Sequence, residues 1–264
     1  MVKIMLRRVF FSTEKERDSL GKIIVNIVIL IGVVGIGIYY SLKKIGLELD
    51  FSFVKQFQGR ILDGFLLTFY ISISSFVLSS LIGVIIFLFQ RSNLIILRYF
   101  SLLYVKFIRG TPLIMQIYLF FYIIGTAWGI DNRFVAGVLI LSIFEGAYIA
   151  EILRGSFESI DKNQIEIARA IGYTKKQTIK FVILPQLIVQ TIPALTGQFA
   201  SIIKDSSLLS IIAIIELTQT MREISSLNFK LFECYILLGV LYLVFTLPLS
   251  YISEKLERRF KYEN

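Results

Sequence analysis

The sequence predicts an all-α membrane protein, a polytopic bundle of about six transmembrane helices. Hydrophobic residues make up 56% of the 264 positions, and the mean hydropathy is +0.75, whereas about half of a soluble domain is apolar. The apolar residues form runs of about twenty, the length at which a helix crosses a bilayer core of ~30 Å. Basic residues gather between these runs, so the net charge of +9 indicates anchoring beside a membrane and not nucleic-acid binding.

Six runs are long enough to span a bilayer: residues 23–42, 64–89, 112–130, 134–153, 186–203 and 232–251. The first run follows a basic stretch, but it is too long for the apolar core of a signal peptide, and the first alanine is Ala127, so no A-x-A cleavage site follows it. We therefore expect this run to remain in the membrane. Arg98 and Lys106 interrupt residues 92–108, which predicts an interfacial elbow helix before the third span.

The distribution of basic residues predicts the topology. Six spans place both termini on one side, where the connecting segments carry 20 Lys and Arg residues against 8 on the other side. The positive-inside rule therefore predicts cytoplasmic termini and a location in the cytoplasmic membrane. Four outer residues oppose this bias around the first span: Lys43, Lys44, Lys55 and Arg60. Because no Pro- or Ser-rich linker occurs, we expect residues 1–60, with the first span and an outer loop, to lead into one membrane domain, residues 61–264.

The chain lacks the side chains of most enzymatic and metal sites. It has no histidine, and its one cysteine, Cys234, lies in an apolar run and suits a packed core position. No G-x-x-x-x-G-K-[ST] phosphate-binding loop occurs. We therefore expect no catalytic residues, no metal site and no cofactor, and any ATP hydrolysis has to come from another chain.

The most informative segment lies between the fourth and fifth spans. Asp161 is an N-cap candidate, and Gln164 three residues later completes the pattern of a capping box. Three residues then share one helical face: Ile165, Ala168 and Ile171. Gly172 suits a left-handed stop at the end of this helix.

A second capping box, Thr174 with Gln177, predicts another short helix, which Pro185 ends or bends. Two short capped helices that meet at a glycine would form a rigid knob on the cytoplasmic side. Such a knob can transmit force. An ordinary capped connector between two spans is the alternative interpretation of the same pattern.

The spacing within this loop carries a family resemblance. Glu166-Ile-Ala168, three residues, Gly172, nine residues and Val182-Ile-Leu184-Pro185 resemble the EAA loop of ABC importer permeases. Ile167 stands where alanine is usual, and Val182 where isoleucine is usual. The resemblance implies that residues 156–185 hold a coupling helix that docks on a separate ATP-binding cassette subunit. The implied coupling residues are Gln164, Glu166, Ala168, Gly172, Leu184 and Pro185.

Further segments resemble the polar amino acid branch of this family: Gly64-Phe-Leu-Leu-Thr68, Arg109-Gly-Thr-Pro-Leu113, Gly146-Ala-Tyr-Ile-Ala-Glu151 with Arg154-Gly155, and Lys204-Asp-Ser-Ser-Leu208. The resemblance implies the type I ABC importer permease fold, with a five-helix core and an additional N-terminal helix. It also implies three protein partners, namely the ATPase, an extracytoplasmic substrate-binding protein and a second, identical or different, permease subunit. The implied substrate is a polar amino acid, and membrane lipid surrounds the chain.

The same motifs also have local physical interpretations. Thr111 can cap a helix that begins with Pro112, and Arg109 just outside can reach lipid headgroups. Arg154 and Gly155 would close the fourth span with a cation and a glycine stop.

Ionisable residues at membrane depth indicate a substrate path. Glu145 lies near the middle of the fourth span, and we hypothesise that it attracts a cationic amino acid or a substrate ammonium group; the alternative is an ion pair with a basic residue. The fifth span is polar, with Gln198 among its side chains, which suits a cavity wall. Lys204-Asp205-Ser206 would then break the helix and offer free N–H groups to a carboxylate, unless it forms a simple outer loop.

Other classes of function fit the sequence less well. A permease for another small polar solute would use the same loop. A channel or self-sufficient transporter has no use for an ATPase dock. A membrane-embedded enzyme would need Glu145 and Asp205 as a carboxylate pair, without histidine to assist them.

Overall fold

The computed structural model describes residues 20–261, in which the regular elements are all helices. Within these residues, five helices are long and apolar enough to cross a membrane, or six if one sharply bent pair counts as a span. The predicted all-α membrane bundle is therefore confirmed. The basic residues that precede Lys22 lie outside the described residues.

The N-terminal helix, α2 (Leu20–Lys44), belongs to a unit of its own, which ends at Asp50. Its span window has none of its residues buried, so its apolar side chains face outward all round. A helix of this kind is stable where lipid or another membrane helix surrounds it. The predicted boundary after residue 60 falls inside the next helix, α3 (Phe53–Gln90).

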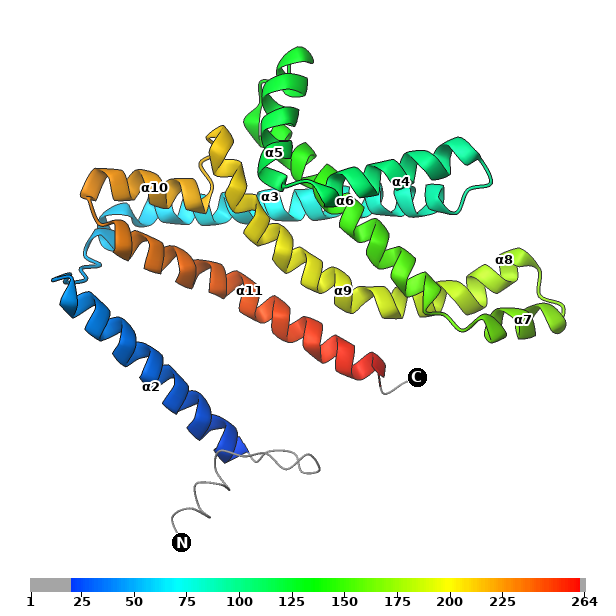
Figure 1. The fold of residues 1–264 in the computed structure, drawn as a ribbon, viewed down its shortest axis with the longest axis horizontal. Helices are drawn as coiled ribbons and strands as arrows, with labels where there is room; N and C mark the ends of the chain where they lie inside the picture. The colour runs from blue at the N-terminus through cyan, green and yellow to red at the C-terminus, as the bar shows by residue number, and fades with distance from the viewer. Residues whose placement is uncertain (1–19, 262–264) are drawn as a thin grey trace, which may run out of the picture. The chain divides into compact units, whose positions relative to one another are not determined.

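The second unit is built around the crossing of α3 and α6 (Arg133–Glu158) (Figure 1). Two glycines allow these backbones to approach closely. A Cβ atom on Gly83 would lie 2.5 Å from Ile149 Cγ2, and one on Gly146 would lie 2.6 Å from Ile82 Cγ2. Small residues at such crossings are typical of membrane helices, which associate through close packing.

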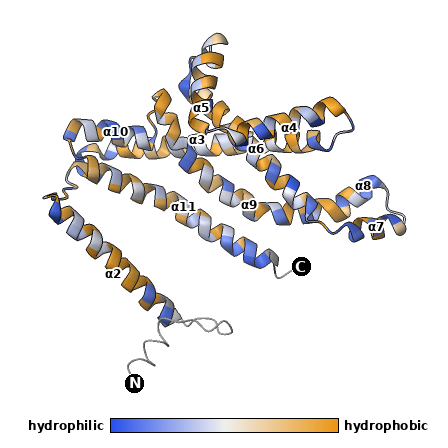
Figure 2. Ribbon diagram, viewed as in Figure 1, coloured by the Kyte–Doolittle hydropathy of each residue, from blue (hydrophilic) through white to orange (hydrophobic). Residues whose placement is uncertain are grey.

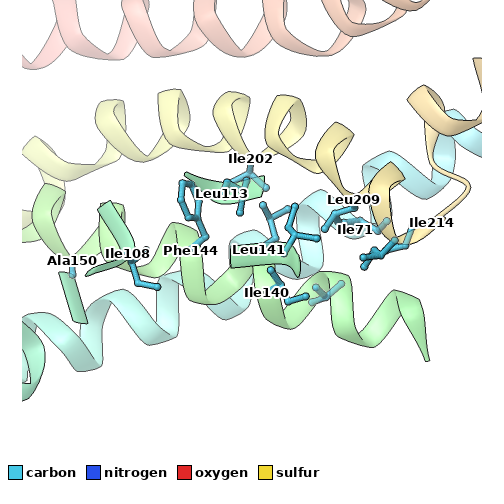
Figure 3. Packing of buried hydrophobic residues seen from close by; sticks show 14 of the residues in the cluster. Ile71, Ile108, Leu113, Ile140, Leu141, Phe144, Ala150, Ile202, Leu209 and Ile214 are labelled. Carbon is cyan, nitrogen blue, oxygen red and sulfur yellow. The ribbon is translucent and has the colours of Figure 1, made fainter. Parts of the chain in front are cut away.

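The main apolar core joins α3 and α6 to α9 (Leu184–Asp205) and the 3₁₀-helix η3 (Ser206–Ile212). Figure 3 shows Ile71, Leu141, Ile202 and Leu209 meeting from these four elements, and all four are fully buried. The last helix, α11 (Leu231–Lys261), packs along α9. A smaller core lies between α3, α11 and α10 (Leu217–Asn228), and the single cysteine, Cys234, is buried in it as expected.

The elbow helix is α4 (Ile95–Gly110), and it meets the next helical run at 112°. That run consists of α5 (Leu113–Tyr118) and the π-helix η1 (Leu119–Gly125), which is too short to count as a span alone. The predicted third span, residues 112–130, therefore counts as a span only together with α4. Pro112 has extended backbone (φ −64°, ψ 139°), which forces the chain to turn between the two helices.

Two predicted helix ends differ from the structure. The Thr111 hydroxyl donates to the Phe107 carbonyl (2.8 Å) of the preceding helix, so it does not cap the following one. Gly155 does not stop the fourth span, because α6 continues to Glu158. Gly155 lies inside the backbone ladder of α6, since its carbonyl accepts from the Ser159 N–H (3.1 Å).

Candidate functional site

The loop between the fourth and fifth spans forms a capped helical knob, which consists of α7 (Lys162–Ala170) and α8 (Lys175–Thr178). Asp161 is the N-cap of α7, since its carboxylate accepts from the Asn163 N–H (2.9 Å). The predicted capping box at this end is wrong. The Gln164 side chain instead accepts from Gln186 Nε2 (2.7 Å), which ties the start of α7 to the start of α9 (Leu184–Asp205).

The end of α7 is a Schellman motif around Gly172. This glycine has φ +91°, and its N–H donates to the Arg169 carbonyl (3.0 Å). The Tyr173 N–H donates to the Ala168 carbonyl (2.9 Å). Together these bonds define the glycine-terminated helix end, so the predicted left-handed stop is confirmed.

The predicted capping box of α8 is also confirmed. The Thr174 hydroxyl accepts from the Gln177 N–H (3.3 Å), and the Gln177 side chain accepts from the Thr174 N–H (2.8 Å). The helix then widens into the π-helix η2 (Ile179–Ile183) and continues through Pro185 into α9. Pro185 therefore does not end the helix, because the wider turn before it accommodates the missing N–H.

The knob presents an apolar and charged surface to its surroundings. Of the predicted apolar face, Ala168 is buried and Ile165 is half-buried, but Ile171 is 67% exposed because it follows the last helical residue. Ile167 is 60% exposed, and the charged Glu166 is exposed beside it. Figure 2 shows hydrophilic residues on α7, α8 and the end of α11. Ile167 and Ile171 lie four residues apart, and neighbouring exposed apolar side chains on a hydrophilic element suit a surface that binds another protein.

Three of the predicted path residues meet in the middle of the helical unit. Glu145 on α6 is fully buried, and Gln198 on α9 donates to its Oε2. The carboxyl group of Asp205, at the end of α9, interacts electrostatically with the Glu145 carboxyl group. No amide or hydroxyl donor from residues 20–261 reaches Glu145 Oε1.

The alternative of an ion pair between Glu145 and a basic residue of this chain finds no support, since none occurs in the part of the chain that the structure describes.

The two other path candidates, Lys204 and Ser206, lie beside Asp205 at the end of α9. Lys204 is exposed near Asp205, and the buried Ser206 donates to the Ile203 carbonyl (2.7 Å). The cluster therefore offers carboxyl oxygens that a cationic or ammonium group could bind.

The predicted helix break at Lys204-Asp205-Ser206 is wrong. The Ser206 N–H donates to the carbonyls of Ile202 and Lys204, so α9 passes directly into η3 without a new helix N-terminus. The chain breaks later, at Ala213, which has φ +54°. The buried residues of η3, such as Leu209, hold this turn against the core, a tertiary effect that local sequence does not reveal.

A new helix N-terminus does form after that break, and its cap is Glu216, a residue that sequence reasoning missed. Its carboxylate accepts from the N–H groups of Thr218 and Gln219 (both 2.8 Å) and from the Tyr242 hydroxyl (3.2 Å). Glu216 is fully buried between two spans, and this burial raises its pKa to about 7. The only sequence signal was an acidic residue before the amphipathic run of α10.

The Gly64-to-Thr68 segment explains why α10 lies so close to α3. The Thr68 hydroxyl accepts from the Leu217 N–H (3.0 Å), and a Cβ atom on Gly64 would lie 2.5 Å from the Thr220 hydroxyl oxygen. A buried helix start needs such partners for its N–H groups. The motif thus fixes the first turn of α10 against α3.

Glu151 is the centre of a second missed group, at the end of α6 near the knob. Its carboxylate binds Arg109 (3.0 Å) and Arg154 (2.9 Å), and it accepts from Gln90 (3.3 Å). Arg154 also binds Glu158 (2.7 Å). The predicted headgroup anchor Arg109 is therefore paired within the protein, although 42% of its side chain is exposed.

Comparison with known proteins assigns this architecture to a class. Residues 79–262 match the family described as "Binding-protein-dependent transport system inner membrane component", and the chain belongs to that family. It is therefore a transport subunit and not an enzyme, and it is a multi-pass membrane protein. Membership implies an ATP-binding subunit and a substrate-binding protein as partners.

Individual relatives cover most of this chain and nearly all of their own length. The glutamine transport system permease protein GlnP of Escherichia coli (strain K12) is 34% identical over 218 residues, 81% of this chain and 99% of that protein. The probable glutamine ABC transporter permease protein GlnM of Bacillus subtilis (strain 168) is 34% identical over 203 residues, 75% of this chain and 94% of that protein. The L-cystine transport system permease protein TcyB of B. subtilis is 34% identical over 217 residues, 81% of this chain and 93% of that protein.

Solved structures agree on the fold. The crystal structure of an amino acid ABC transporter with histidines superposes with a TM-score of 0.75 and 32% identity, covering 81% of this chain and all of that chain. The MetNI methionine ABC transporter in an inward-facing form has a TM-score of 0.59 and 18% identity, covering 79% of this chain and 99% of that chain, and supports the fold alone. The resemblance in the EAA loop and the polar amino acid motifs is thus confirmed at the level of the family.

Proposed function

We propose that this chain is the permease subunit of an importer that moves polar amino acids across the cytoplasmic membrane, driven by a separate ATPase. The names of the relatives support the substrate class, since they are permeases for glutamine, cystine or amino acids in general. A permease for a different small polar solute is the second candidate, because the knob itself carries no information about the substrate.

The observation that carries the proposal is the knob formed by α7 and α8. Its two helices are fixed by Asp161, by the Gly172 turn and by the Thr174 box, and they expose Glu166 and Ile167. A rigid exposed element is suited to receive the closing motion of an ATPase. We assign ATPase contact to the exposed residues and a structural role to the buried Ala168.

A connection to the membrane helices supports coupling. The hydrogen bond from Gln186 to Gln164 joins the knob to the start of α9, and the helix runs without interruption past Leu184 and Pro185. A displacement of the knob would therefore move α9, and α9 carries Gln198 and Asp205. This continuity supports a mechanical link between the ATPase and the path.

We further propose that the knob and both termini lie on the cytoplasmic side. The excess of Lys and Arg in the segments on this side supports the orientation. The ATPase is cytoplasmic, so the substrate-binding protein would meet the opposite end, where α10 lies.

The substrate path is proposed to pass Glu145, Gln198 and Asp205, with Lys204 and Ser206 at its outer end. Two neighbouring carboxyl groups and one amide oxygen favour an ammonium group or a cationic side chain, and burial excludes competing water. One such bundle does not enclose a path, so a second permease subunit, identical or different, is proposed to complete it.

Transport by the reconstituted complex tests this proposal. The chain, its ATPase and its binding protein would be placed in proteoliposomes with ATP inside, and uptake of labelled glutamine, cystine, lysine and arginine would be measured. We expect ATP-dependent uptake of at least one of these amino acids. A complex that hydrolyses ATP but imports none of them would overturn the assignment of the substrate class.

A further inference from the structure

A cavity of about 600 Å³ lies at the end of the unit that carries the knob. Its walls come from the end of α3 at Gln90, from one face of α4, and from the end of α6 at Glu151. Its lining residues do not belong to α7 or α8, which carry the proposed ATPase contact. The cavity is also separate from the Glu145 cluster in its lining residues.

The lining is strongly basic. It contains four cations, Arg98, Lys106, Arg109 and Arg154, and one carboxylate, Glu151. Glu151 already binds Arg109 and Arg154. Arg98 and Lys106 form no ion pair with any residue between 20 and 261. The cavity therefore holds an uncompensated positive charge, which attracts an anion.

The two free cations are arranged along one stripe of α4. Arg98, Leu102 and Lys106 follow one another at intervals of four residues, so they lie on one face of the helix. Leu102 and Tyr99 supply apolar surface between the charges. Paired cations around an apolar strip suit a molecule with a phosphate group and a hydrocarbon part.

The exposed apolar residues of α4 indicate that the phosphate belongs to a lipid. Ile96 is 76% exposed and Leu103 is 65% exposed, although α4 packs on α3 and α6. Such apolar exposure next to cations is typical of a helix at the membrane interface. Basic pockets between membrane helices on the cytoplasmic side are suited to anionic headgroups.

We propose that this cavity binds the phosphate group of an anionic phospholipid, with Arg98 and Lys106 as its principal ligands and Arg109 and Arg154 as supporting charges. The acyl chains extend along the exposed apolar residues of α4. The bound lipid fixes the elbow between α4 and α5 against the ends of α3 and α6. This inference does not depend on which solute the protein carries.

Lipid retention by the intact importer complex tests the proposal. The wild-type complex, the variant R98Q/K106Q and the control K255Q/R258Q would be purified in detergent and titrated with phosphatidylglycerol and, separately, phosphatidylcholine. Bound lipids would be counted by native mass spectrometry. The control removes the same charge from the exposed end of α11, outside the cavity.

We expect the wild type and the control to bind phosphatidylglycerol equally, and R98Q/K106Q to bind it roughly thirtyfold more weakly, given an attraction of about 1 kcal/mol for each of the two basic residues. Phosphatidylcholine binding should be the same in all three. Equal phosphatidylglycerol affinity of R98Q/K106Q and the wild type would overturn the proposal. A separate titration with inorganic phosphate distinguishes a lipid headgroup from free phosphate. If the wild type bound inorganic phosphate saturably but did not bind phosphatidylglycerol, and R98Q/K106Q lost the phosphate binding, the ligand would be free phosphate and the lipid proposal would be overturned.

Discussion

At the residue scale, the most informative side chains are two buried carboxyl groups, Glu145 and Glu216. Glu145 shares its environment with Gln198 and Asp205, from an element more than fifty positions away in sequence. Its depth in an apolar run was visible from the sequence. Its neighbours could be identified only from the packing of α6 against α9. The polar residues of the fifth span did not show which of them would lie opposite Glu145.

Replacing Glu145 tests whether the cluster recognises positive charge. In the complete importer, Glu145→Gln is expected to lower ATP-dependent uptake of lysine and arginine by about tenfold, since one charge interaction of ~1.4 kcal/mol is lost. Uptake of neutral amino acids should fall less. Glu254→Gln, an exposed acid on α11, is the matched control. Unchanged uptake of lysine, arginine and neutral amino acids alike would refute the role of Glu145.

Glu216 makes stability depend on pH. Its pKa is raised from 4.5 to about 7 in the folded state, so the folded protein binds a proton more tightly than the unfolded chain. The contribution of Glu216 to stability should therefore be fully present below pH ~4.5, fall as the pH rises towards 7, and change no further above it. We expect the Tm of the detergent-purified protein to fall across this window, and Glu216→Gln to flatten that dependence.

The pH dependence of the Tm distinguishes the titration of Glu216 from the loss of its role as the N-cap of α10. Glu216→Gln also weakens the hydrogen bonds to Thr218 and Gln219, which lowers the Tm at every pH. A variant whose Tm keeps the wild-type pH slope, whatever its absolute value, would show that another group titrates in this range.

At the scale of elements, the best predictions were those whose cause is local. The caps at Asp161 and Thr174 and the glycine stop at Gly172 depend on hydrogen bonds within a few residues, and all three are found. The errors occurred where distant packing decides. Gln164 bonds to Gln186 instead of its own helix, and η3 continues α9 because Leu209 is held in the core.

The glycine turn of the knob gives a matched pair of variants. Gly172→Ala places a side chain at φ +91°, which costs on the order of 1 kcal/mol and distorts the junction of α7 and α8. Gly155→Ala lies within α6 with no atom within 4 Å of the added Cβ, so it should be neutral or slightly stabilising.

We expect Gly172→Ala to reduce uptake and the recovery of the ATPase with the purified permease severalfold, while Gly155→Ala retains both. The recovery would be measured by quantifying the ATPase band after affinity purification of the permease. Identical behaviour of the two variants would mean that the geometry at Gly172 has no part in coupling.

At the scale of the whole molecule, composition alone predicted a helical membrane protein, because apolar runs of span length have few other uses. An elbow before Pro112 was predicted, but its angle of 112° was not, since hydropathy is insensitive to the direction of a helix. The basic cavity beside α4 was equally hidden. Its charges come from α4 and α6, between residues 98 and 154, and meet only when these two helices pack together.

The central claim is that the knob faces the cytoplasm and contacts an ATPase. Its most direct test is the labelling of Glu166→Cys, in a Cys234→Ser background, by a membrane-impermeant maleimide in right-side-out and inside-out vesicles. Labelling is predicted only in inside-out vesicles, with protection when the ATPase subunit is bound. Labelling from the outside, or equal labelling with and without the bound ATPase, would contradict the account.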